Sequence, residues 1–126
     1  MSNILIIDDD EDFCEALKDS ISLLLDGEQI SLCNESSQIF NLIESRSVDL
    51  VITDMVMPDV EGIEIITRLK QEKPQLPIIA MSGGGRVGGN NYLMLAETLG
   101  ADAIFEKPLS IVELTNKVKA LLVANR

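Results

Sequence analysis

Three aspartates stand directly after short apolar runs of this sequence. Asp8 and Asp9 follow the run at residues 4–7, and Asp54 follows the run at residues 50–53. Carboxylates held close together repel one another, and a divalent cation removes that penalty and keeps them ionised. An oxygen-only set of two or three carboxylates suits Mg²⁺, which retains water molecules that incoming phosphate oxygens can replace. The pattern therefore predicts a Mg²⁺ site at Asp8, Asp9 and Asp54.

Asp54, Ser82 and Lys107 together have the chemistry of phosphoryl transfer. A carboxylate beside bound Mg²⁺ can act as a nucleophile toward a phosphoryl donor and give an acyl phosphate. Ser82 follows the apolar run at residues 78–81, and its hydroxyl can bind a phosphoryl oxygen. Lys107 stands between an apolar run and Pro108, and its ammonium group can neutralise charge on the phosphoryl group. These residues predict a site at which Asp54 accepts a phosphoryl group.

Some acidic residues near this site have a plainer interpretation. Asp10, Glu11 and Asp12 open an amphipathic stretch, and negative charge stabilises the N-terminus of a helix. We therefore predict that these three cap and stabilise a helix. Asp54 taken alone is also typical of a turn before Pro58. Its place after an expected buried strand, at the same sheet edge as the first acidic run, favours the functional interpretation.

Short apolar runs alternate along the chain with stretches whose apolar residues recur at helical spacing. The expected strands span residues 4–7, 29–33, 50–53, 78–81 and 103–105. The expected helices span residues 11–25, 36–45, 63–73 and 92–99, and Ser110 is expected to cap a last helix. Five of the eight glycines fall within residues 83–89. This segment matches neither common phosphate-binding glycine motif, which favours a mobile loop over a phosphate cradle.

This order of elements predicts an α/β fold with five strand–helix units, (βα)5. Near-continuous apolar strands are typical of a parallel sheet that helices cover on both faces. Right-handed crossovers favour a doubly wound sheet, because a closed eight-fold barrel needs about twice this length. We expect residues 1–126 to form a single domain. The functional crevice of such a sheet lies beyond the carboxyl ends of its strands, where the candidate residues fall.

The composition argues against several classes of protein. The chain has 126 residues, a net charge of −11 and no histidine. The acidic balance argues against direct binding of nucleic acid and favours a cation or a basic partner surface. The lack of histidine excludes an imidazole base and a histidine-ligated metal within this chain. Cys14 and Cys33 are expected to be buried thiols in a reducing compartment, and no stretch approaches the roughly 18 apolar residues of a membrane span, so we predict a cytoplasmic protein.

Four motifs resemble the response-regulator receiver domain of two-component signalling, and they cover essentially the whole chain in the family's order. They read ILIIDDDED, LVITDMVMPDVEG, IIAMSGGG and AIFEKPL. The resemblance implies a flavodoxin-like fold, similar to that of chemotaxis regulators, with strand order 2-1-3-4-5. It also implies that Asp54 is the phospho-acceptor, that Asp9 binds Mg²⁺ directly, and that Asp8 binds it directly or through water. The backbone carbonyl of Val56 would complete the protein ligands.

The same resemblance implies roles for three residues on later strands. Ser82 matches the hydroxyl that moves toward the phosphoryl group during switching, and Lys107 matches the lysine that pairs with the phosphate. Phe105 matches an aromatic position that swings inward as the hydroxyl moves. An ordinary phenylalanine of an edge strand is an equally good interpretation of Phe105, so both remain open.

The predicted function is a phosphorylatable signalling switch. A histidine kinase or a histidine phosphotransferase would donate the phosphoryl group to Asp54 in a Mg²⁺-dependent reaction, and a downstream protein target would respond by protein–protein contact. The protein is expected to catalyse its own phosphorylation and dephosphorylation without being an enzyme in the usual sense. One alternative is a docking module of the same fold that is never phosphorylated. A Mg²⁺-dependent phosphohydrolase is a weaker alternative, because Val56 stands where such enzymes typically carry an acid/base carboxylate.

Overall fold

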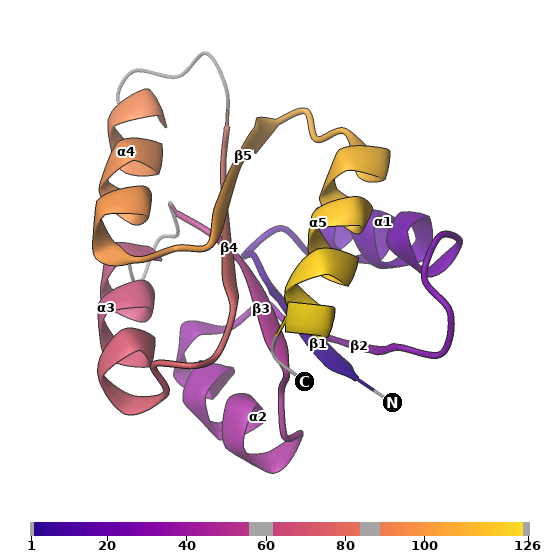
Figure 1. Ribbon diagram of the computed structural model, residues 1–126, viewed down its shortest axis with the longest axis horizontal. Coiled ribbons are helices and arrows are strands. Elements are labelled where there is room, and N and C mark those ends of the chain that lie inside the picture. The colour runs from indigo at the N-terminus through magenta and orange to yellow at the C-terminus, as the bar shows by residue number, and fades with distance from the viewer. Residues whose placement is uncertain (1, 56–61, 84–88, 125–126) are drawn as a thin grey trace.

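The computed structural model describes residues 2–55, 62–83 and 89–124, with the backbone alone in residues 89–93. Strands and α-helices alternate along the described chain (Figure 1). The strands are β1 (Asn3–Ile7), β2 (Gln29–Cys33), β3 (Leu50–Asp54), β4 (Ile78–Gly83) and β5 (Ala103–Lys107). The α-helices are α1 (Glu11–Ser22), α2 (Ile39–Ser45), α3 (Gly62–Glu72), α4 (Gly89–Leu99) and α5 (Ile111–Ala124), and a short 3₁₀ helix, η1 (Ser36–Gln38), precedes α2.

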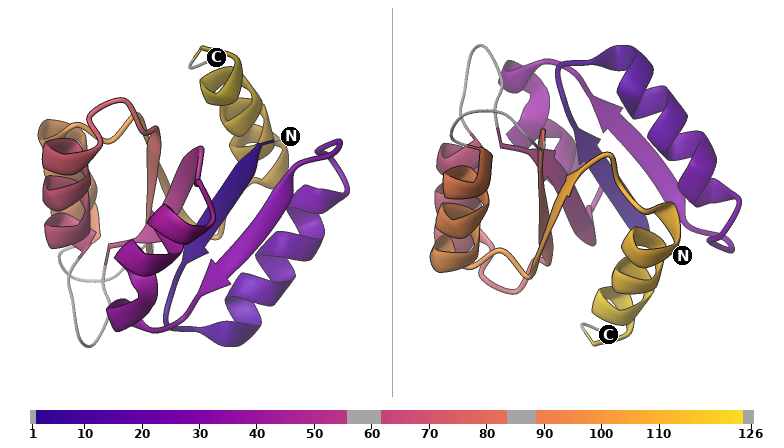
Figure 2. Two further views of the ribbon diagram at one scale, coloured as in Figure 1. Left: turned by 90° about the horizontal axis from the view of Figure 1, so that it is seen from below. Right: turned by 90° about the horizontal axis from the view of Figure 1, so that it is seen from above.

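The five strands form one sheet in the order β2-β1-β3-β4-β5, and every neighbouring pair is parallel. Helices α1 and α5 lie on one face of the sheet, while α2, α3 and α4 lie on the other (Figure 2). The prediction of a doubly wound (βα)5 fold with order 2-1-3-4-5 is therefore confirmed. In the described part of the chain, no helix combines the length and the apolar character that a membrane crossing requires.

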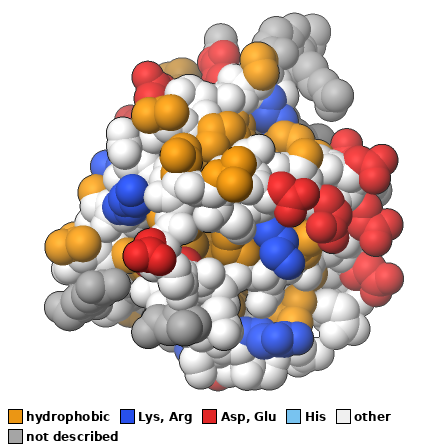
Figure 3. All heavy atoms as spheres, turned by 90° about the vertical axis from the view of Figure 1, so that its right-hand side faces the viewer, with side chains coloured by type: hydrophobic (Ala, Val, Ile, Leu, Met, Phe, Trp, Pro, Cys, Tyr) orange, Lys and Arg blue, Asp and Glu red, His pale blue; other side chains and the backbone are white. Residues whose placement is uncertain are grey.

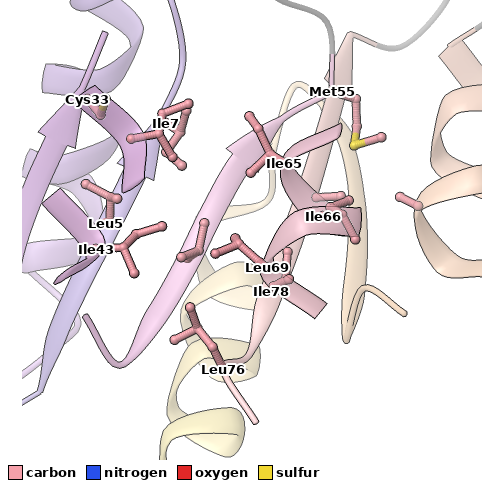
Figure 4. Packing of buried hydrophobic residues seen from close by; sticks show 14 residues of the cluster. Leu5, Ile7, Cys33, Ile43, Met55, Ile65, Ile66, Leu69, Leu76 and Ile78 are labelled. Atoms are coloured by element: carbon pink, nitrogen blue, oxygen red, sulfur yellow. The ribbon is translucent and has the colours of Figure 1, made fainter. Parts of the chain in front are cut away.

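Both faces of the central strands are buried, because successive side chains point to opposite sides of a strand. Leu5 of β1 lies in a cluster with Ile43 of α2 and Ile66 of α3 on one face (Figure 4). Its neighbour Ile6 lies in a second cluster on the other face, together with Leu17 of α1. This double burial explains why the strands are unbroken apolar runs in the sequence rather than alternating ones.

Three helix boundaries differ from the sequence prediction by three residues. The helix expected over residues 36–45 begins as the 3₁₀ helix η1, and α2 itself starts at Ile39. Helix α1 ends at Ser22 rather than residue 25, and the N–H of Leu24 donates to the carbonyl of Ile21 at 3.1 Å, a bond of the 3₁₀ type that tightens the chain at the helix end. The apolar pattern continues past this end, but Leu23 is 85% exposed. Helix α4 begins at Gly89, earlier than the expected residue 92. The loop expected in the glycine-rich segment falls largely on residues 84–88, which lie outside the described residues.

Three strands extend beyond their apolar runs to include candidate site residues. Asp54 ends β3 and pairs with Met81 of β4. Ser82 pairs with Glu106, and Lys107 pairs with Gly83 at the last rung between β4 and β5. The candidate residues therefore occupy the last rungs of the sheet, at the edge where the carboxyl ends of the parallel strands meet. We call this the C-terminal edge.

Gly62 fixes how α3 begins beside that edge. A Cβ atom at this position would lie 2.6 Å from Cα of Met55 and 2.7 Å from the carbonyl oxygen of Asp54, which is too close for any side chain. The N–H of Gly62 donates to the carbonyl of Met55 at 3.0 Å. The absence of a side chain thus lets α3 start directly against the backbone that follows Asp54.

Candidate functional site

Asp8, Asp9 and Asp54 converge at the C-terminal edge. Asp8 follows β1, Asp54 ends β3, and these two strands are neighbours in the sheet. One carboxylate oxygen from each of the three residues lies within 4.8 Å of the other two. Asp8 and Asp54 are 1% and 7% exposed, whereas Asp9 is open to solvent. Such a close set of hard oxygen donors fits a divalent cation of the Mg²⁺ type.

The backbone and the carboxylate of Asp8 are both held in place. Its N–H donates to the carbonyl of Cys33 at 3.1 Å, which continues the β1–β2 ladder by one bond. Its Oδ1 accepts the N–H of Asp10 at 3.0 Å, and its carbonyl accepts Nδ2 of Asn34 at 3.0 Å. These three hydrogen bonds fix the position of Asp8 at the end of β1.

Lys107 supplies the positive charge for this acidic cluster. Its Nζ lies 2.8 Å from Oδ2 of Asp8 and 3.6 Å from Oδ1 of Asp54, and its side chain is 24% exposed. The Lys107–Pro108 peptide bond is cis. One ammonium group thus forms ion pairs with two buried carboxylates.

The pKa of Asp54 is raised to about 6. Burial of the carboxyl group is the largest cause, and the negative charge of Asp8 is the second. The ammonium group of Lys107 and a hydrogen bond from the backbone of Met55 act in the opposite direction. The ionised form of Asp54 is therefore less stable in the folded protein than in the unfolded chain. A cation bound between the carboxylates would restore the ionised form.

This raised pKa predicts that Asp54→Asn stabilises the protein when Mg²⁺ is removed. The folded state binds the extra proton between about pH 4 and pH 6, so stability is lost as the pH rises through the folded-state pKa. Asparagine resembles the protonated form, and we expect it to raise the free energy of unfolding by up to about 3 kcal/mol at pH 8. Urea unfolding in EDTA measures the difference. The difference in the free energy of unfolding between Asp54→Asn and the wild-type protein should shrink from pH 8 to pH 4. A difference that stayed constant would contradict this prediction.

Ser82 lies on β4, the strand next to β3, and Phe105 lies on β5, the edge strand beyond β4. Ser82 is 2% exposed near the end of β4, beside the Asp54 strand end. Phe105 of β5 is partly buried, pairs with Met81, and packs against the cluster on the face covered by α1 and α5. Val56, whose carbonyl the resemblance assigns to the metal, lies outside the described residues.

Of the acidic residues at the start of α1, Asp10 caps the helix as predicted, and Glu11 and Asp12 lie in its first turn, where negative charge is favourable. Oδ1 of Asp10 accepts the N–H of Phe13 at 3.1 Å, and Glu11 and Asp12 lie exposed in the first helical turn. Figure 3 shows acidic side chains gathered at one side of the face that α1 and α5 form. Ser110 caps α5 in the same way, since its Oγ accepts the N–H of Glu113 at 3.3 Å.

Two residues near the site carry no role in the sequence prediction. Asn34 follows β2, and its Nδ2 lies 3.0 Å from the carbonyl of Asp8 and 3.4 Å from Sγ of Cys14. Phe13 of α1 places its ring beneath Lys107, with Nζ 4.1 Å from the ring centroid. Phe13 is indistinguishable in the sequence from the other apolar positions of α1. Asn34 lies in no motif, so only the fold reveals its contact with Asp8.

Cys14 and Cys33 are buried free thiols, as predicted. Burial, reinforced by the charge of Asp8, raises the pKa of the Cys14 thiol to about 12. Cys14 belongs to the cluster beneath α1 and α5, whereas Cys33 belongs to the cluster on the other face of the sheet. Neither thiol is placed to act as a nucleophile at the acidic cluster, because both are buried and the Cys14 thiol stays protonated.

The family model described as response regulator receiver domain matches residues 4–119 of the chain. The chain belongs to this family. Receiver domains are signalling modules of two-component systems, so the resemblance carried by the four motifs is confirmed. The arrangement of the acidic cluster, Ser82 and Lys107 can therefore be considered as a receiver-domain site.

Two curated relatives are about 30% identical to this receiver domain over the aligned residues. The chain is 30% identical to the response regulator MprA of Mycolicibacterium vanbaalenii over 119 residues, covering 94% of this chain and 49% of that protein. It is 31% identical to the transcriptional regulatory protein FixJ of Bradyrhizobium diazoefficiens over 122 residues, covering 95% of this chain and 56% of that protein. The chain thus spans about half the length of these relatives.

A solved receiver domain has nearly the same fold. It is the signal receiver domain of a DNA-binding response regulator from Colwellia psychrerythraea, with a TM-score of 0.87 and 27% sequence identity. The match covers 97% of this chain and 98% of that one. A receiver domain from Clostridium thermocellum matches with a TM-score of 0.86 at 25% identity, covering 98% of this chain and 96% of that one.

Proposed function

We propose that this receiver domain is a phosphorylatable switch in which Asp54 accepts a phosphoryl group from a phosphohistidine. The donor would be a histidine kinase or a histidine phosphotransferase. The observation that carries the proposal is the position of Asp54. Its buried carboxylate lies at the last rung of β3, beside two further carboxylates and one ammonium group. This combination provides a nucleophile, a cation site and a positive charge for the transferred group.

In the proposed reaction a carboxylate oxygen of Asp54 attacks the phosphorus atom. The new O–P bond forms as the P–N bond of the phosphohistidine breaks. The leaving imidazole nitrogen keeps the bonding electron pair and takes up a proton from solvent. Phosphoryl transfer depends mostly on positioning and on charge stabilisation, so the groups around Asp54 carry the catalysis.

Asp8 and Asp9 would hold Mg²⁺ together with Asp54 and the backbone carbonyl of Val56. The bound ion would neutralise charge on the phosphoryl oxygens and keep the clustered carboxylates ionised. Lys107, 3.6 Å from Oδ1 of Asp54, is placed to pair with a phosphoryl oxygen. The hydroxyl of Ser82 would donate a hydrogen bond to another phosphoryl oxygen from the neighbouring strand.

New contacts of the phosphoryl group with Ser82 and Lys107 would bias the domain between two states. Phe105 lies on the strand that carries Lys107 and is partly buried, so a rotation of its ring would connect the site with the surface of β5. We infer that residues 1–126 form one receiver domain, that it works in the cytoplasm, and that a downstream protein reads its state. The net charge of −11 supports the absence of direct nucleic acid contact by these residues.

Intact mass spectrometry tests the proposed function. We expect incubation with a small acyl phosphate donor and Mg²⁺ to add one phosphoryl group per chain, and EDTA to prevent the addition. Only one phosphoryl group is added per chain, because Asp54 cannot react again until its acyl phosphate is hydrolysed. No adduct at saturating donor and Mg²⁺ would overturn the proposal in favour of an unphosphorylated docking module. Multiple-turnover release of phosphate from a generic phosphomonoester would instead indicate a phosphohydrolase.

A further inference from the structure

The ring of Phe13 lies against the ammonium group that serves the acidic cluster. Nζ of Lys107 is 4.1 Å from the ring centroid, while the same atom is 2.8 Å from Oδ2 of Asp8 and 3.6 Å from Oδ1 of Asp54. The separation falls within the range of a cation–π contact, in which the ring face attracts a positive charge. Lys107 is therefore held by two carboxylates and by one uncharged aromatic face.

The backbone and the packing of α1 fix this ring in place. The N–H of Phe13 is bonded to Oδ1 of Asp10, the residue that caps α1. The side chain is partly buried and packs against the cluster on the α1 and α5 face of the sheet. The start of α1, the helix that follows Asp8, therefore fixes the orientation of the ring face next to the site.

The ring differs from the two carboxylates in one respect that matters for the reaction. In the proposed function, Asp8 takes part in binding a divalent cation and Asp54 becomes an acyl phosphate, so both change as partners of Lys107. The attraction of the ring for the ammonium group does not depend on either change. Phe13 would therefore hold the ammonium group of Lys107 at the site when Asp8 binds the cation and Asp54 carries the phosphoryl group.

We propose that Phe13 is a positioning residue that keeps the ammonium group of Lys107 directed at the phosphoryl group on Asp54. This inference rests on the proposed function and adds a residue to it. A ring that only filled space in the core would have a different signature. Its loss would shift the start of α1, and with it Asp8 and Asp9, so it would weaken Mg²⁺ binding as well as phosphorylation.

Phe13→Leu and Phe13→Tyr separate these two roles. Leucine keeps an apolar side chain but removes the aromatic face, whereas tyrosine keeps the ring. For Phe13→Leu at saturating donor and Mg²⁺, we expect the rate of adduct formation to fall about two- to tenfold, the effect of losing a partly exposed cation–π contact. The Mg²⁺ dissociation constant, measured by calorimetry, should change less than about twofold, and Phe13→Tyr should stay close to wild type on both measurements.

Each other outcome counts against the role of Phe13. An unchanged rate in Phe13→Leu would show that the contact does not matter for the reaction. A parallel loss of rate and of Mg²⁺ affinity would show a structural role. Urea unfolding of all three proteins ensures that rates are compared only where each is folded. No adduct in the wild-type protein would overturn the proposed function itself, whereas a wild-type adduct with either of the first two results overturns only this inference.

Discussion

Asp54→Asn should abolish phosphorylation of the domain. The substitution keeps the size of the side chain but removes the nucleophilic oxygen, and losing the nucleophile of a reaction costs far more than losing a supporting contact. With a small acyl phosphate donor and Mg²⁺, we expect at least about a hundredfold less adduct by intact mass than in the wild-type protein. Unfolding would not account for this loss, because the neutral side chain removes the cost of burying a charge and the repulsion from Asp8, which together raise the pKa of Asp54.

Asp12→Asn is the matched control for this substitution. Asp12 is exposed in the first turn of α1, outside the cluster of Asp8, Asp9 and Asp54, and the chemical change is the same. We expect this variant to form the adduct at close to the wild-type rate. A substantial adduct in Asp54→Asn, with the control unchanged, would show that another residue is the acceptor.

Asp9→Asn should weaken Mg²⁺ binding without disturbing the buried part of the site. Asp9 is exposed to solvent, so its substitution changes the donor set without creating a buried unpaired group. Asp8 is a poorer choice, because it is 1% exposed and pairs with Lys107 at 2.8 Å. Losing a supporting contact of a ligand already costs about 10- to 100-fold in metal affinity, so losing a ligand should cost at least as much.

Isothermal titration calorimetry with Mg²⁺ measures this effect. Asp12→Asn again serves as the control, since it removes one negative charge from the same end of the molecule without touching the cluster. The difference in Mg²⁺ affinity between the two variants separates the effect of direct coordination from the long-range attraction of the acidic surface for a cation. Equal affinities in Asp9→Asn and Asp12→Asn would remove Asp9 from the metal site.

The fold could be predicted from the sequence because each local pattern agreed with the others. Unbroken apolar runs required a sheet buried on both faces, and the alternating order of elements required parallel strands. Helix ends were less predictable. The apolar pattern of α1 continues through Leu23 and Leu24, yet the helix ends at Ser22, because a helix end depends on local hydrogen bonds that apolar spacing does not encode.

The acidic cluster could be predicted because its members stand at the carboxyl end of a strand or directly after it. Parallel strands place their carboxyl ends at one edge of the sheet, and the strand order that the family resemblance implies makes β1 and β3 neighbours, which brings Asp8, Asp9 and Asp54 together. Phe13 and Asn34 could not be predicted in this way. Their contacts depend on the rotation of α1 and on the chain direction after β2, which are set by packing in three dimensions.

Reductive trapping tests most directly the claim that Asp54 carries the phosphoryl group. Borohydride converts an aspartyl phosphate into homoserine, and peptide mass spectrometry then identifies the converted residue. After incubation with a small acyl phosphate donor and Mg²⁺, we expect homoserine at position 54 and at no other aspartate. Homoserine at position 8 or 9, or none in a sample whose intact mass includes a phosphoryl group, would contradict the assignment of Asp54.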